Sequence, residues 1–135
     1  IKETVEKVDI DRNAFKANIM DLPGKILEKQ NFILALKQKQ SEAQNLLEYR
    51  KGQELLSIAE ACDPLDGKKL FSNEAARQAE LLKRLRGNPD LKAMTDDAQN
   101  KDFDVAKERN NLEYLQNTLS SYKLIVKLLE LEGDQ

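Results

Sequence analysis

Apolar residues recur at every seventh position through the last third of the chain. One row is apolar throughout and contains Leu91, Ala98, Val105, Leu112, Leu119 and Val126. A second row contains Met94, Leu115, Tyr122 and Leu129, and is interrupted by Lys101 and Glu108. Such a repeat is typical of a long helix lying along a partner helix. We predict that the helix seam and interface are formed by Leu112, Leu115, Leu119, Tyr122, Val126 and Leu129.

Turn and capping residues divide the chain around this repeat. Pro is tolerated at the first position of a helix, so Pro23 predicts the start of a long helix over 23–61. The sequence Asp-Pro-Leu-Asp-Gly at 63–67 predicts a turn. Ser72 or Asn73 is suited to cap a short helix over 73–86.

The clearest boundary is Gly87-Asn88-Pro89, where Gly follows one helix and Asn caps the next. The last helix is predicted over 89–132, with a weak point near Thr95 that would allow a break. Gly52 lies inside the first long helix. Two reasons for a glycine there are open: another backbone approaches closely, or the helix bends. Residues 1–20 predict a separate short helical segment that Asp11 could cap, with Phe15 and Ile19 on one face.

These elements predict a single all-α domain. It would be an elongated, antiparallel, coiled-coil-like hairpin with a short helix at the tip and a short N-terminal helical segment. A turn centred near residue 75 would place Gln40 and Ala43 near Glu108. One apolar stripe per helix covers the seam, yet Phe32, Tyr114 and several leucines lie off it. We therefore predict a homo-oligomer. The alternative is a monomeric three-helix bundle completed by residues 1–20.

Composition agrees with long helices, because charged residues make up 34% of the chain and aromatic residues 5%. The net charge of −2 does not favour a polycation for nucleic acid. Cys62 is the single cysteine, so a disulfide within the chain is excluded. No apolar run is long enough to cross a bilayer and no signal peptide is recognisable, so we expect a cytoplasmic protein with no membrane partner.

The residues that commonly carry catalysis are missing. Histidine is absent, and Cys62 lies beside Asp63, whose charge would oppose thiolate formation. The acidic run over 96–104 lacks the glycine and glutamate of a calcium loop and is interpreted as a solvated face. No glycine-rich loop suited to phosphate is present. We therefore expect neither an enzyme nor a bound metal or cofactor.

Basic residues gather around the predicted tip, where 63–92 contains seven basic and five acidic side chains. From residue 93 onward the charge is net negative, with nine acids and five bases. Lys83, Arg84 and Arg86 could contact phosphates, although no aromatic residues are interleaved for stacking on bases. The alternatives are a solvated surface or a complement to the acidic stem of a second copy.

Three short stretches resemble a group of small helical-hairpin proteins. They are 73–77 (Asn-Glu-Ala-Ala-Arg), 112–115 (Leu-Glu-Tyr-Leu) and 121–125 (Ser-Tyr-Lys-Leu-Ile). These are encoded in the recombination modules of phages and mobile elements. The resemblance covers roughly 70–130 and implies an accessory role in DNA recombination or replication, with no catalytic residues to carry over. The resulting prediction is a non-enzymatic assembly or adaptor protein. The alternative is a DNA-binding accessory that uses Lys83, Arg84 and Arg86.

Overall fold

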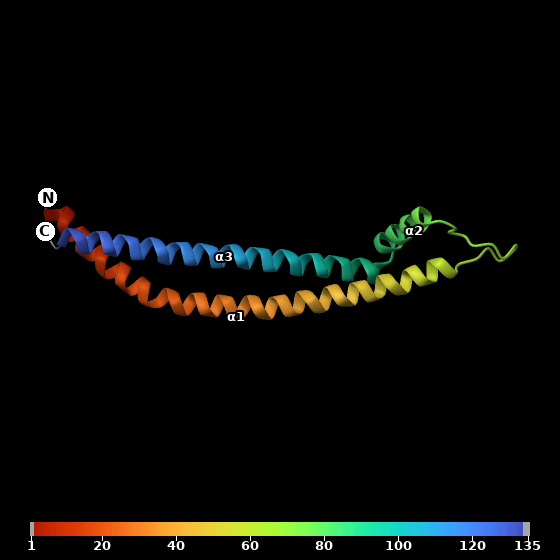
Figure 1. Ribbon diagram of the computed structural model, residues 1–135, viewed down its shortest axis with the longest axis horizontal. Coiled ribbons are helices and arrows are strands. Elements are labelled where there is room, and N and C mark those ends of the chain that lie inside the picture. Colours follow the sequence, from red (N-terminus) through yellow and green to blue (C-terminus); the bar gives the residue numbers. More distant parts are fainter. Residues whose placement is uncertain (1, 134–135) are drawn as a thin grey trace. The chain divides into compact units, whose positions relative to one another are not determined.

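The computed structural model describes the backbone of residues 2–133, and side-chain burial for 13, 14 and 16–133. It contains three helices, α1 (Lys2–Glu60), α2 (Glu74–Gly87) and α3 (Pro89–Gly133) (Figure 1). Within residues 2–133 the structure forms no strand, and a single isolated bridge joins Cys62 to Lys69. The predicted all-α class is therefore confirmed.

The start of α1 differs from the prediction. We expected a helix to begin at Pro23, but α1 begins at Lys2 and Pro23 lies inside it. Proline is a start signal because it lacks an N–H, yet a helix can continue through it at a cost of about 3 kcal/mol. The ribbon of α1 curves in its red-to-orange part (Figure 1), as helices commonly do near proline. The side chains proposed for the N-terminal segment, Asp11 and Phe15, lie outside the described residues, and Ile19 is half-buried.

The segment between α1 and α2 is shaped by short-range hydrogen bonds. Asp63 and Asp66 each accept a bond from the backbone N–H two residues on, at 2.8 and 2.9 Å. Gly67 has a φ of 72°, a conformation that glycine adopts readily. The Nζ of Lys69 donates to the carbonyl of Ala59 at 2.9 Å, which satisfies an acceptor in the last turn of α1. These contacts form the turn that the sequence predicted.

Side-chain caps define where α2 and α3 begin. Asn73 accepts a hydrogen bond from the N–H of Ala76 at 2.7 Å, and α2 begins at the next residue. Asn88 accepts bonds from the N–H groups of Asp90 and Leu91 at 2.9 and 3.3 Å and caps α3. No break occurs near Thr95, whose hydroxyl donates to the carbonyl of Leu91 at 2.8 Å inside an uninterrupted helix.

The chain divides into two compact units, and α1 and α3 each contribute to both. Unit 1 contains residues 1–35 and 106–135, and unit 2 contains residues 36–105. In unit 2 the amides of Gln40 and Gln44 donate to one oxygen of Asp102 at 2.8 and 2.7 Å. In unit 1 Lys29 pairs with Glu108 at 2.7 Å. The two long helices are therefore antiparallel neighbours within each unit (Figure 1).

These pairs correct the predicted register. Glu108 was expected near Gln40 and Ala43, but it pairs with Lys29, about three helical turns earlier along α1. The prediction aligned polar residues with one another without regard to their charge. In the structure a carboxylate instead meets an ammonium group, and the amide of Gln40 meets another carboxylate, on Asp102.

The two units differ in their cores. Among side chains whose burial is described, unit 2 buries Leu47, Ile58, Leu81, Leu91, Ala98 and Val105. Ile58 and Leu91 are 0% exposed. Unit 1 buries only Leu22 and Ile33 within the same described set. Gly52 is not explained by close packing, since a Cβ added there would meet nothing within 4 Å.

Candidate interaction surfaces

The predicted phosphate contacts lie on α2, and one of them already has protein partners. The guanidinium of Arg84 lies 3.1 Å from a carboxylate oxygen of Glu80 and 3.1 Å from one of Glu54 on α1. It also donates to the hydroxyl of Ser57 at 3.3 Å. Hydrogen bonds to Glu80 and then Glu54 raise the pKa of Arg84 above its usual value. Arg84 therefore holds α2 against α1.

Lys83 and Arg86 are exposed on the same helix. A phosphate that contacted Arg84 would compete with two carboxylates already in place. The basic cluster therefore offers two accessible cations instead of three, and phosphate binding there stays a prediction. The sequence suggested a complement to acids of a second copy. The structure shows Arg84 paired with acids of its own chain, on α1 and α2.

The predicted seam changes character along α3. Its first-row positions Leu91, Ala98 and Val105 are buried in unit 2. The six residues chosen from sequence are all half-buried, and all belong to unit 1: Leu112, Leu115, Leu119, Tyr122, Val126 and Leu129. None of the described side chains of α3 after Val105 is fully buried. The same heptad pattern thus gives buried side chains in unit 2 and half-buried ones in unit 1.

Unit 1 also exposes large apolar side chains on both of its helices. On α1 these are Met20, Leu27, Phe32 and Leu34. On α3 they are Tyr114, Leu124, Leu128 and Leu131. Burying such side chains stabilises a protein by about 1.5–3 kcal/mol each, so their exposure on both helices favours contact with another surface.

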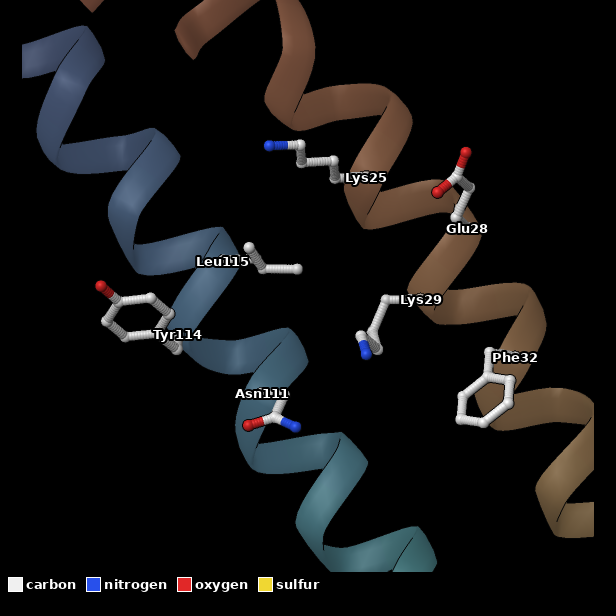
Figure 2. A pocket seen from close by; sticks show the side chains of 7 residues that line it. All are labelled: Lys25, Glu28, Lys29, Phe32, Asn111, Tyr114 and Leu115. Carbon is white, nitrogen blue, oxygen red and sulfur yellow. The ribbon is translucent and has the colours of Figure 1, made fainter.

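A groove runs along one face of this unit (Figure 2). Its lining comes from two helices: Lys25, Glu28, Lys29 and Phe32 on α1, and Asn111, Tyr114 and Leu115 on α3. Lys29 reaches Glu108 at 2.7 Å, and its Nζ lies 5.7 Å from the centre of the Phe32 ring. The cation is therefore held between a carboxylate and an aromatic face, where it fixes the spacing of α1 and α3.

Sequence reasoning identified Phe32 and Tyr114 only as residues off the seam, and it did not place them together. It missed Lys29 as the partner of Glu108, and Glu54 as the partner of Arg84. Glu108 did carry a signal, because a carboxylate in a heptad row that is apolar apart from Lys101 and Glu108 favours a cation across the seam. The identity of that cation depends on the register, which the pattern alone does not define.

The ion pair between Lys29 and Glu108 gives unit 1 an acid-sensitive contact. The hydrogen bond from Lys29 lowers the pKa of the Glu108 carboxyl, with help from Asn111. The folded-state pKa is thus below the unfolded value of about 4.3, so the carboxylate stabilises the fold above that pH. This stabilisation is lost as the pH falls through the folded-state pKa.

We expect Glu108→Gln to lower the melting temperature at about pH 7 and to change it progressively less below about pH 4, where the wild-type carboxyl is also neutral. Thermal unfolding followed by circular dichroism across this range measures the difference. The control is Glu113→Gln, an exposed carboxyl on the same helix. A Glu108→Gln curve that stays parallel to the wild-type curve at every pH would contradict the role assigned to the pair.

Metal binding, thiol chemistry and membrane insertion each depend on particular side chains of the described residues. Among them, no group of three or more Cys, Asp or Glu side chains is placed to hold a metal ion. Cys62 is exposed, and its thiol donates to the carbonyl of Glu60 at 3.3 Å. None of the helices within residues 2–133 has a stretch apolar enough to span a bilayer.

No protein-family model matches the chain, and no significant match was found among curated proteins or solved structures.

Proposed function

We propose that the chain is a non-enzymatic assembly protein that associates with further copies of itself through the helical faces of unit 1. One observation carries the proposal: unit 1 has two buried side chains among those described, yet exposes eight large apolar ones. Two helices that bury so little against each other are marginal in water, since helices gain most of their stability from packing. Cover from another chain would supply the missing burial.

The resemblance to helical hairpins of phage recombination modules agrees with an accessory, scaffold-like role in such DNA metabolism.

The test is the mass of the protein in solution, measured by sedimentation equilibrium at micromolar concentrations. We expect a mass above the 15.4 kDa of one chain. Because the contact is mainly apolar, it should persist when salt rises from about 50 to 500 mM, whereas phosphate binding weakens steeply. A monomer at every concentration, together with salt-sensitive binding of a labelled single-stranded oligonucleotide, would contradict the proposal and favour the DNA-binding alternative.

A further inference from the structure

A second heptad row lies on α1, away from the face that contacts α3. Met20, Leu27 and Leu34 are spaced seven residues apart, and they are 82%, 58% and 64% exposed. Lys29 lies between α1 and α3 (Figure 2), where it reaches Glu108. Leu27 precedes Lys29 by two residues and therefore points about 200° away from it around the helix. An apolar row of this period is the pattern by which one helix packs along another.

The residues between these three complete the heptads. If Met20, Leu27 and Leu34 occupy position d, then Gly24 and Asn31 occupy position a, and both are exposed. In a parallel pair of identical helices, each position a meets the same position of the other helix. The amide of Asn31 would then meet an identical amide, which can both donate and accept a hydrogen bond. An Asn at position a among apolar residues is known to specify the register and number of helices.

The charged residues beside this row distinguish a parallel pair from an antiparallel one. Lys16 occupies position g, and Asp21 and Glu28 occupy position e; all three are exposed. In a parallel pair, position g of one helix lies beside the position e that follows five residues later in the other, so Lys16 meets Asp21. Lys37 and Glu42 repeat this spacing. An antiparallel pair would instead place the acids at position e beside one another, which is unfavourable.

We infer that α1 forms a parallel, in-register coiled coil with α1 of a second copy, through the row of Met20, Leu27 and Leu34. Asn31 of each copy pairs with Asn31 of the other, and the lysines at position g meet the acids at position e. The face of α1 that contacts α3 within the same chain stays in place. This inference rests on the proposed self-association and adds the surface and the orientation through which it occurs.

The first test removes two leucines of the row. We expect Leu27→Ser/Leu34→Ser to weaken association by at least about 100-fold, because four apolar side chains leave each dimer interface. The matched control is Leu124→Ser/Leu131→Ser, which changes two leucines of α3 in the same unit that are 58% and 56% exposed. It should weaken association by less than about 5-fold, as expected of residues outside the interface. Sedimentation equilibrium gives both values, and circular dichroism verifies that helix content is retained.

The second test determines orientation and register by disulfide formation, in a Cys62→Ser chain that lacks the exposed native thiol. A disulfide requires the two Cα atoms to lie within about 7 Å of each other. Asn31→Cys should therefore cross-link to its counterpart in a glutathione redox buffer at least about 10-fold faster than Lys25→Cys, an exposed position of the same helix outside the row. Adding Leu27→Ser/Leu34→Ser should remove this advantage.

The outcomes separate this inference from the proposal on which it rests. If the control leucines matter and Leu27 and Leu34 do not, another face is the interface, but self-association stands. Equal cross-linking of Asn31→Cys and Lys25→Cys would overturn the in-register pair. Faster cross-linking in a mixture of Met20→Cys and Leu34→Cys would show that the pair is antiparallel. If the wild-type chain never associates, the proposed function itself fails.

Discussion

Leu91→Asp is expected to abolish the cooperative unfolding transition of unit 2. Leu91 is 0% exposed and lies in the first turn of α3, three residues after the Asn88 cap. Truncating a buried leucine to alanine already costs about 2–5 kcal/mol. An aspartate must in addition bury a carboxylate, for which the described core offers no buried polar or charged partner. The free energy of unfolding of a small domain is only about 5–15 kcal/mol, so this loss is comparable to the entire stability of the unit.

Urea and thermal unfolding followed by circular dichroism measure this effect. The control is Phe103→Asp, which introduces the same charge in the same unit at a side chain that is 68% exposed. Surface changes of this kind usually alter stability by about 0.5 kcal/mol or less. If Leu91→Asp melted at the wild-type temperature, Leu91 would not belong to the core of unit 2.

The sequence predicted the helices best at their N-termini, where hydrogen bonds between near neighbours define the first residue. Asn73 and Asn88 accept the N–H groups that a helix start leaves unpaired, and these bonds involve residues only two or three positions away. A short stretch of sequence is therefore enough to predict these caps. The heptad rows indicated which face of α3 turns inward, and Leu91, Ala98 and Val105 are buried in the structure.

The same pattern could not distinguish Leu91 from Leu119. Both occupy one heptad row, but Leu91 is buried and Leu119 is only half-buried. Periodicity gives the direction in which a side chain points, whereas burial depends on how much other structure covers that face. In unit 2 the chain itself adds α2, through the contacts of Arg84 with Glu54. The sequence pattern of α3 alone does not predict that α2 packs in unit 2.

Long-range pairing was the least predictable feature. The partners Lys29 and Glu108 are far apart in sequence, as are Gln40 and Asp102. Their register depends on the exact path of the segment between α1 and α2. Arg84 illustrates the same difficulty. Its position in a basic cluster of the sequence suggested that it was free to bind phosphate, but in the structure it pairs with Glu54. Charge counts along a chain do not reveal which cations are already neutralised.

Pro23 provides a prediction of the opposite sign, since we expect Pro23→Ala to stabilise unit 1. Inside α1 the ring nitrogen of Pro23 cannot donate to the carbonyl of the residue four positions earlier, and proline in a helix interior costs about 3 kcal/mol relative to alanine. Alanine restores the N–H, but it also increases the entropy of the unfolded chain, which offsets about 0.4–1 kcal/mol. A net gain of about 2 kcal/mol would raise the melting temperature by roughly 10 °C for a unit of this size.

Thermal unfolding at a fixed protein concentration tests this, because association would otherwise shift the melting temperature. Gly52→Ala is the matched control: it also improves a position inside α1, but in unit 2, and an added Cβ there has open space. It should gain about 1 kcal/mol, the usual difference between alanine and glycine in a helix. A lower melting temperature for Pro23→Ala would show that unit 1 requires a bend at proline. The curvature of α1 would then contribute to its packing on α3, and the missing hydrogen bond would be a necessary cost of that geometry.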